Sequence, residues 1–148
     1  DVDRGGRITW HGPGQIVGYP IVLLEKRNEV VGFVRTIESA LIETLKHFGI
    51  NGSQIDGKTG VWIKDERSER KIAAIGVRVA KGVTMHGFAL NVCPDLSNFQ
   101  RIIPCGMPEA ETTSMEKELG RSISFAEVTK VLEPLMVEAL LKVSKIQP

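Results

Sequence analysis

The sequence has few cysteines, few aromatic residues and no long apolar run, and each shortage excludes a class of protein. Its two cysteines, Cys93 and Cys105, are too few to staple a chain of 148 residues, so we expect free thiols in a reducing compartment, the cytoplasm. No apolar run approaches the roughly 18 residues of a membrane span, and the first residues show no basic-then-apolar signal pattern. We therefore expect no membrane partner.

The chain also lacks a charge of one dominant sign, since its formal net charge is +1. One segment differs, because seven basic residues lie between positions 58 and 81 against three acidic ones. The basic residues are Lys58, Lys64, Arg67, Arg70, Lys71, Arg78 and Lys81, and the acidic ones are Asp65, Glu66 and Glu69. This excess could steer an acidic macromolecule, but a solvated hairpin face is the simpler interpretation.

The length and composition predict one globular domain. Residues 1–148 are 42% hydrophobic and 25% charged, with no repeat and no low-complexity tract, which argues against disorder. The chain begins with Asp1, and a glycine-rich loop follows at once with no preceding strand or helix. We therefore expect that an N-terminal segment of the domain is missing.

The order of apolar patterns predicts an α+β fold with a mixed, largely antiparallel sheet flanked by helices. Residues 16–24 favour a buried strand, although Gly18 and Pro20 suggest a bulge or an edge position. Apolar residues recur every three or four positions over 29–48, as in an amphipathic helix capped by Asn28 and stopped by Gly49. Segments 60–64, 71–79 and 83–92 then predict a three-stranded meander. The regular strand–helix alternation of a doubly wound nucleotide fold is missing.

The last third of the sequence predicts helices. Residues 95–102 favour a short helix before the segment "IPCGMP". Thr113 with Glu116, and Ser124 with Glu127, each match a capping box that opens a helix.

The first twenty residues, "DVDRGGRITWHGPGQIVGYP", combine five glycines with arginine, tryptophan and histidine side chains. A plain flexible linker would carry small polar residues in place of these large groups. The mixture indicates a loop whose backbone approaches a ligand closely while its large side chains wall the pocket. It matches neither a Walker loop nor a dinucleotide fingerprint, because the lysine and the glycine spacing are absent.

Cys105 is the strongest candidate nucleophile, because Pro104 stiffens its approach and Gly106 leaves the sulfur open to a substrate. A free cysteine is nevertheless more often a small buried hydrophobe, and this reading is favoured still more strongly for Cys93. A reactive thiol needs a histidine or a cation nearby. Lys71 opens an apolar strand and could be this cation, although a solvated hairpin lysine is the simpler alternative. His47 is better explained as a helix C-terminal residue.

A metal site built from His11, His86, Cys93 and Cys105 is also disfavoured. The sequence contains no CxxC pair and no histidine pair at helical spacing. We therefore expect no metal.

Several motifs in order resemble the lipoyl(octanoyl) transferase family, an acyltransferase family of lipoate biosynthesis. They are "DRGGRITWHGPGQIVGYPI" (3–21), "TGVWI" (59–63), "KIAAIGVRV" (71–79), Thr84 with "HGFALNV" (86–92), "IIPCGM" (102–107) and "TTS" (112–114). The resemblance implies the fold of biotin and lipoate protein ligases. It also implies that Cys105 carries the acyl group as a thioester and that Lys71 lowers the pKa of this thiol and transfers protons.

The resemblance implies a set of substrate contacts as well. These are Arg4, Gly5, Gly6, Arg7, Ile8, Thr9, Trp10, His11, Ala74, Ile75, Gly76, Gly87, Phe88 and Ala89. The implied donor is octanoyl acyl carrier protein, and the implied acceptors are lipoyl domains of 2-oxoacid dehydrogenase complexes and the glycine cleavage H protein. No cofactor, no ATP and no nucleic acid partner is implied. Two alternatives remain: an ATP-dependent lipoate or biotin ligase, and a non-catalytic module that binds lipoyl domains.

Overall fold

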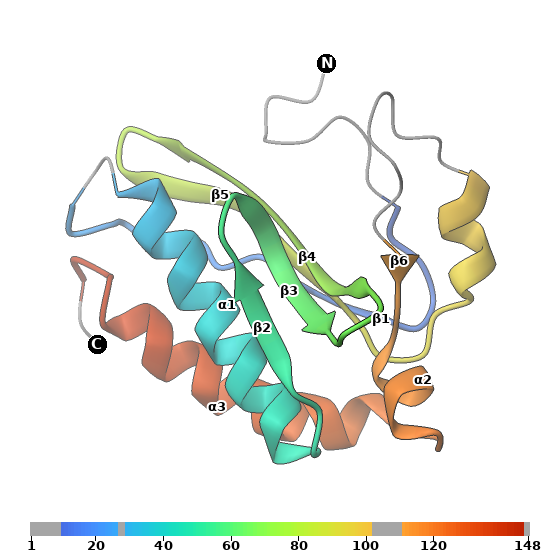
Figure 1. Ribbon diagram of the computed structural model, residues 1–148. Coiled ribbons are helices and arrows are strands. Elements are labelled where there is room, and N and C mark those ends of the chain that lie inside the picture. The colour runs from blue at the N-terminus through green and yellow to red at the C-terminus, as the bar shows by residue number, and fades with distance from the viewer. Residues whose placement is uncertain (1–9, 27–28, 102–110, 147–148) are drawn as a thin grey trace.

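A computed structural model describes residues 10–26, 29–101 and 111–146, and one mixed sheet forms its centre. Its elements in chain order are β1 (Gln15–Gly18), α1 (Val30–His47), β2 (Gly52–Ile55), β3 (Lys58–Lys64), β4 (Glu69–Ala80), β5 (Val83–Asn91), a 3-10 helix (Leu96–Arg101), β6 (Glu111–Thr112), α2 (Met115–Leu119) and α3 (Phe125–Leu141). Figure 1 shows α1 and α3 lying side by side across one face of the sheet.

The sheet has the order β1-β5-β4-β3-β2 with antiparallel neighbours, and β6 adds a short parallel pairing to β4. This confirms the predicted α+β fold with a mixed, largely antiparallel sheet and its three-stranded meander. Strand β2 was not predicted from the sequence. Its four residues, "GSQI", contain a single large apolar side chain, so they carry no alternation to recognise.

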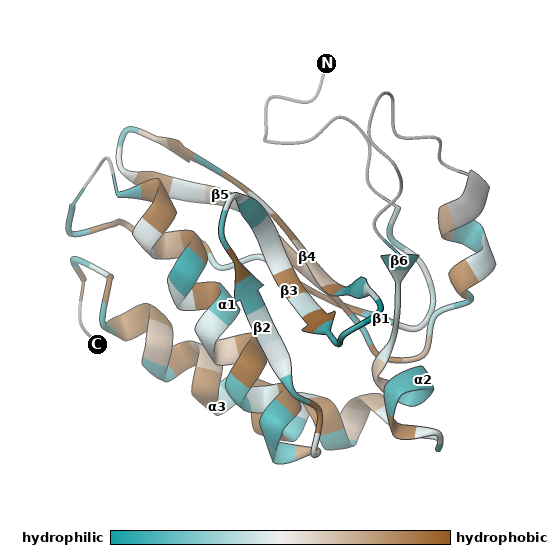
Figure 2. Ribbon diagram, in the orientation of Figure 1, coloured by the Kyte–Doolittle hydropathy of each residue, from teal (hydrophilic) through white to brown (hydrophobic). Residues whose placement is uncertain are grey.

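Helix α1 confirms the predicted amphipathic pattern, because it buries one stripe of residues against the sheet and α3. Phe33, Ile37, Leu41 and Leu45 are each at most 1% exposed. Gly49 follows the helix with a φ of +83°, a conformation that glycine adopts without strain, so the predicted stop is confirmed. Figure 2 shows apolar residues alternating with hydrophilic ones along α1, whereas α2 and the short strand β6 are hydrophilic.

Two predicted details at the ends of elements are wrong. The first strand ends at Gly18, and residues 23 and 24 make only isolated bridges, because Pro20 has no amide hydrogen to continue the ladder. The N-cap of α1 is Glu29, and the predicted Asn28 lies outside the described residues. The short helix predicted over residues 95–102 is confirmed as a 3-10 helix over Leu96–Arg101.

The two predicted capping boxes have different outcomes. At α3 the box is complete, since the Ser124 side chain accepts from the Glu127 amide and the Glu127 carboxylate accepts from the Ser124 amide. At α2 the N-cap is Ser114, not Thr113. The Thr113 hydroxyl donates to Glu118 instead, so it is not available to cap the helix.

Among the helices of the described segments, none has the length and apolar composition needed to cross a bilayer.

Candidate active site

A β-bulge in β4 decides which side chains reach the open face of the sheet, the face away from α1 and α3. Trp62 of β3 pairs with Lys71, but the preceding residue, Val61, pairs with Ala73, so Ile72 is the extra residue. Cross-strand partners lie on the same face of a sheet, and successive residues of a strand lie on opposite faces. Lys71 therefore lies on the face of Trp62, which is opposite to that of Ala73 and is the same as that of Ala74. Without the bulge, Lys71 would share the face of Ala73, whose side chain is fully buried.

A glycine and a buried carboxylate hold the bulge in place. Gly60 has a φ of +113°, and a Cβ there would lie 2.5 Å from the Ala73 carbonyl oxygen, so only glycine fits without displacement. Its amide donates to Oε1 of Glu38 at 2.9 Å, and this carboxylate, fully buried in α1, also pairs with Arg35 at 2.8 Å. A buried charge that is both hydrogen-bonded and paired is tolerated, so the helix anchors the strand at the bulge.

A cleft of about 270 Å³ lies over β1, β5 and β4 beyond the bulge. Its lining residues are His11, Val17, Tyr19, Ala74, Gly76, His86, Gly87, Phe88 and Ala89. Small residues let the backbone form much of the wall. Gly87 is required sterically, because a Cβ there would lie 1.9 Å from the Gly18 carbonyl oxygen. The surface therefore suits an apolar chain more than a polyanion.

Six of the substrate contacts expected from the resemblance lie in this cleft: His11, Ala74, Gly76, Gly87, Phe88 and Ala89. Ile75 does not line it, because its side chain alternates to the other face and packs against the hydrophobic core. Trp10 packs edge-on against Phe99 at 5.1 Å between ring centroids, outside the lining. Residues Arg4, Gly5, Gly6, Arg7, Ile8 and Thr9 lie outside the described residues, as does Cys105.

Three further lining residues had not been expected as contacts. Val17 and His86 belong to the motifs quoted above, and Tyr19 follows β1 with 63% of its surface exposed. Strand alternation could have found Val17, but it does not predict His86, which directly precedes the lining residue Gly87 on β5.

Lys71 is half-buried, and its ammonium lies on an aromatic ring. Nζ is 4.6 Å from the ring centroid of Trp62, and Nζ of Lys58 is 5.4 Å from the same centroid. Burial lowers the pKa of Lys71, and the positive charge of Lys58 lowers it further. Within the described segments no carboxylate pairs with Lys71. An amine in this setting can change its protonation state more easily than a surface lysine.

Strand β6 brings the end of the segment that contains Cys105 beside Lys71. Thr112 pairs with Lys71 in the parallel ladder, and the amide of Thr113 donates to the Lys71 carbonyl at 3.0 Å. Cys105 precedes Glu111, the first residue of β6, by six positions. The chain thus lies beside Lys71 at Thr112, seven positions after Cys105.

Side-chain hydrogen bonds tie β6 to the glycine-rich loop across the end of β5. Nδ2 of Asn91, which is 4% exposed, donates to the Thr113 carbonyl at 3.0 Å. Its Oδ1 accepts from Nε2 of Gln15 at 2.9 Å, and Oε1 of Gln15 accepts from the Gly12 amide at 3.1 Å. The loop and β6 are therefore held on a common frame.

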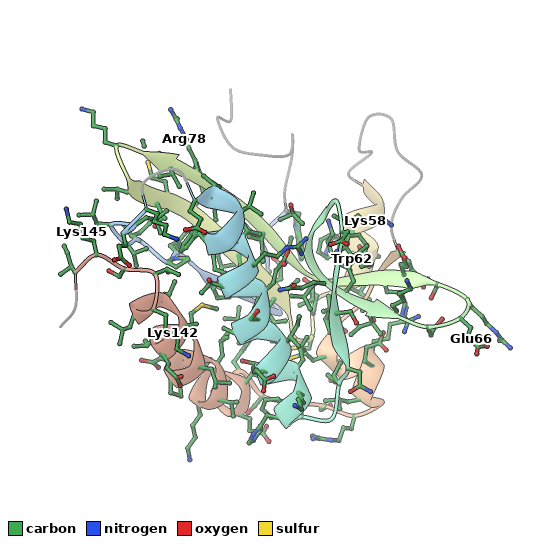
Figure 3. The ribbon with its side chains drawn as sticks, turned by 60° about the vertical axis from the view of Figure 1, so that its left-hand side comes forward. Lys58, Trp62, Glu66, Arg78, Lys142 and Lys145 are labelled. Carbon is green, nitrogen blue, oxygen red and sulfur yellow. The ribbon has the colours of Figure 1, made fainter. Side chains whose placement is uncertain are left out.

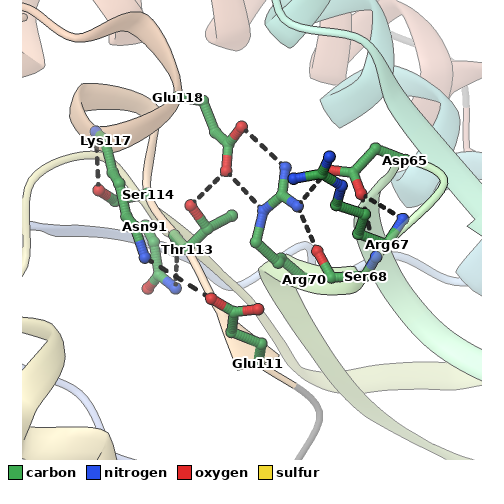
Figure 4. Close-up of polar contacts among 10 residues, drawn as sticks. All are labelled: Asp65, Arg67, Ser68, Arg70, Asn91, Glu111, Thr113, Ser114, Lys117 and Glu118. Carbon is green, nitrogen blue, oxygen red and sulfur yellow. Dashed lines mark hydrogen bonds and ion pairs between the residues drawn. The ribbon is translucent and has the colours of Figure 1, made fainter.

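Arg70 lies at the centre of a second polar network, drawn in Figure 4. Its guanidinium pairs with Glu118 of α2 at 3.0 Å and with Asp65 at 2.5 Å. These hydrogen bonds raise the pKa of Arg70, and the bond from Arg70 lowers the pKa of Asp65 to about 2. Burial raises the pKa of Glu118, but hydrogen bonds from Arg70 and Thr113 outweigh it and lower the value overall.

Most of the basic excess near Lys71 is neutralised within the hairpin. Lys58 and Lys64 both pair with Glu69, and Arg70 has its two carboxylates. Figure 3 shows Arg78 at the opposite end of the sheet from Lys58 and Trp62. The seven cations therefore do not form one patch, which favours the structural interpretation for those beside Lys71.

The remaining candidate groups lie apart from Lys71. Cys93 is a free, partly buried thiol packed against the core. His47 ends α1, is exposed, and contacts the ring of Phe48. In the part of the chain that the structure describes, no three His, Cys, Asp or Glu residues are grouped as a metal site requires.

Comparison with known families and sequences gives consistent matches. A family model described as the lipoyl protein ligase A/B catalytic domain matches residues 1–135. The octanoyltransferase of Acidothermus cellulolyticus is 55% identical over 141 residues, which cover 95% of this chain and 64% of that protein. The octanoyltransferase of Clavibacter sepedonicus is 52% identical, covering 95% of this chain and 62% of its own. The chain thus spans less than two thirds of the length of these relatives.

Solved structures show the same fold at low sequence identity. A bi-partite lipoate protein ligase from Thermoplasma acidophilum superimposes with a TM-score of 0.68 at 19% identity, covering 93% of this chain and 56% of that one. Biotin protein ligase from Aquifex aeolicus gives a TM-score of 0.59 at 18% identity, covering 82% and 51%. These matches confirm the expected ligase-like fold.

Proposed function

Because the chain belongs to the lipoyl protein ligase A/B catalytic domain family, we propose that it is the catalytic part of an octanoyltransferase that works through a thioester on Cys105. The structural observation that carries the proposal is the position of β6. This strand leads directly from the Cys105 segment and pairs with Lys71, the one lysine of the hairpin that is both half-buried and free of a carboxylate within the described residues.

In the first half-reaction the Cys105 thiolate attacks the carbonyl carbon of an octanoyl thioester on acyl carrier protein. A new carbon–sulfur bond forms, the bond to the carrier's thiol breaks, and the departing sulfur takes up a proton. The Lys71 ammonium stabilises the thiolate before attack and can supply that proton. One thioester replaces another, so the step needs no ATP.

In the second half-reaction the amine of a lysine on a lipoyl domain attacks the acyl-enzyme. An amide forms, the Cys105 sulfur leaves, and the proton lost by the amine returns through Lys71 to the sulfur. Amide resonance exceeds that of a thioester, which makes this step favourable. Lipoyl domains of 2-oxoacid dehydrogenase complexes and the glycine cleavage H protein are the acceptors that we propose.

The cleft suits the acyl chain. Its floor consists of glycine and alanine residues on β4 and β5, and Val17 adds an apolar wall. Burial of methylene groups there would contribute about 0.8 kcal/mol each. Among the described residues, the titratable side chains that line the cleft are His11, Tyr19 and His86, and none of them is a carboxylate.

The test is the intact mass of the protein after incubation with octanoyl acyl carrier protein and no ATP. We expect a gain of one octanoyl group that hydroxylamine removes, that Cys105→Ala abolishes and that Cys93→Ala retains. Addition of a lipoyl domain should then transfer the group to its lysine. Strict dependence on ATP would support the ligase alternative, and tight binding of the lipoyl domain without any acylation would support the non-catalytic module.

A further inference from the structure

We propose that Trp62 is a positioning residue, whose ring face holds the Lys71 ammonium, in its charged form, on the open face of the sheet. The proposal rests on the proposed function for its catalytic meaning, but the contact itself is a property of the fold. It assigns a task to a buried side chain that the two half-reactions do not otherwise use.

The first argument is geometric. Trp62 and Lys71 are direct cross-strand partners, and the bulge at Ile72 puts both on the same face. The 4.6 Å between Nζ and the ring centroid is well inside the roughly 6 Å over which an ammonium is attracted to an indole face. Trp62 is 3% exposed, so little water screens the contact.

The second argument comes from the charges around Lys71. On β3, Lys58 adds a like charge over the same ring, but its own ammonium pairs with Glu69. On β6, the carboxylate of Glu111 pairs with Lys117 at 3.8 Å. No described acidic group is left to favour the charged amine, so the ring is the group in contact that does so.

The third argument concerns the indole N–H. Nε1 of Trp62 is buried and, within the described residues, has no hydrogen-bond partner. An orphan donor of this kind destabilises a fold, and a phenylalanine would avoid it. The presence of tryptophan is therefore explained by the face of the ring, which attracts a cation more strongly than that of phenylalanine.

The contact opposes the two influences that lower the pKa of Lys71, namely burial and Lys58. A thiolate on Cys105 needs a charged partner, whereas proton transfer needs an amine that can also lose its proton. Because the ring offsets part of the effect of burial, the pKa of Lys71 stays high enough for the amine to be charged and low enough for it to lose its proton.

The test is an NMR pH titration of the full chain labelled in its lysine side chains, with the Lys71 signal assigned by its loss in Lys71→Arg. Biosynthetic replacement of tryptophan by mono- and difluorotryptophan weakens the ring quadrupole while preserving its shape. We expect the pKa of Lys71 to fall stepwise with fluorination, and Trp62→Leu to lower it by about one unit. A pKa that stays constant across these rings would overturn the proposal.

Matched controls separate the ring from other effects. In the Trp62→Phe background only Trp10 can be fluorinated, and the Lys71 pKa should then not respond. Lys58→Met should raise the pKa of Lys71, whereas Lys64→Met, which also removes a β3 lysine paired with Glu69, should leave it unchanged. The fluorinated proteins keep the shape of the native ring, so they decide the matter even where Trp62→Leu fails to fold.

The outcome is independent of the proposed function. If the pKa of Lys71 changes with fluorination of the ring but the protein never acquires an octanoyl group, the contact is supported and the transferase is refuted. Acylation of Cys105 with no dependence of the Lys71 pKa on the ring would support the transferase and refute the role of Trp62. The rate of Cys105 alkylation, measured by peptide mass spectrometry as a function of pH, connects the Trp62–Lys71 contact to the thiol. Its pH profile should shift when the pKa of Lys71 shifts.

Discussion

Arg70 and Lys71 are consecutive cations on β4, and their surroundings differ in every respect that matters for function. Arg70 shares the face of its partner Ile63, and its guanidinium is held by Glu118 and Asp65. Lys71 lies on the other face, where it contacts the ring of Trp62. Arg70, which pairs with two carboxylates, has a raised pKa, whereas Lys71, which pairs with none among the described residues, has a lowered pKa.

The difference shows how one strand separates stability from reactivity. Arg70 ties the β3–β4 turn to α2, and its charge is satisfied within the fold. The charge of Lys71 is left available on the face where β6 arrives. Alternation along the strand sets this contrast, so substitutions at either position should produce opposite patterns of activity and stability.

The largest effect is expected for Lys71→Ala. We predict that octanoyl transfer slows by roughly 100-fold to 10,000-fold, because the thiolate loses its cation and the leaving groups lose their proton donor. The midpoint of thermal unfolding should not fall, because the variant no longer has to bury a charged ammonium group. Single-turnover assays measure the rate of octanoyl transfer, and thermal unfolding measures the midpoint. Lys64→Ala is the control for both. A transfer rate within a few-fold of the native rate would remove Lys71 from the mechanism.

Gly60→Ala should disturb the bulge at Ile72, which puts Lys71 on the face opposite to that of Ala73. The added Cβ would lie 2.5 Å from the Ala73 carbonyl at a φ of +113°, so we expect the free energy of unfolding to fall by about 3 kcal/mol. Gly57→Ala is the matched control: its φ is +75° and nothing lies within 4 Å, so the loss should be about 1 kcal/mol. Urea unfolding gives both values, and equal losses would show that the bulge is not constrained by Gly60.

Glu118→Gln should weaken the interaction that holds Arg70 while leaving the rate of octanoyl transfer nearly unchanged. We expect the free energy of unfolding at pH 7 to fall by roughly 2 kcal/mol, because a charged hydrogen bond to Arg70 is lost. The pKa of Glu118 is lowered below 4.5, so its contribution is complete above that pH and disappears as the pH falls through the folded-state value. Urea unfolding from pH 7 to pH 3 should show the two proteins converging, whereas a constant gap would contradict the assignment.

The smallest effect is expected for Lys71→Met on stability. The pKa of Lys71 is lowered below 10.5, so between the folded-state value and 10.5 the unfolded chain binds the proton more readily. Native stability therefore rises with pH through that window, and the methionine variant lacks this slope. The variant should be slightly more stable at neutral pH and lose the advantage as the pH nears 10.5. A gap that widens with pH would show that Lys71 is stabilised as a cation.

Local patterns were sufficient for much of the fold. The spacing of apolar residues located α1, apolar segments bounded by polar turns located β3, β4 and β5, and the capping box located the start of α3. The family resemblance, not these patterns, implied Ala74, Gly76, Gly87 and Ala89, which line the cleft in two cross-strand pairs. The patterns did not reveal β2 or the end of β1, where few side chains carry the alternation.

The sequence by itself determined the types of chemical group and the segments that carry them: a thiol in a "PCG" segment, a lysine in an apolar strand, and small residues on two strands. Only the tertiary structure decided which groups share a face. One extra residue at Ile72 reverses the alternation of β4, because register is set by pairing with another strand and by the Glu38 carboxylate from α1, not by neighbours in the chain. The contact between Lys71 and Trp62, and the arrival of β6 beside them, follow from that pairing.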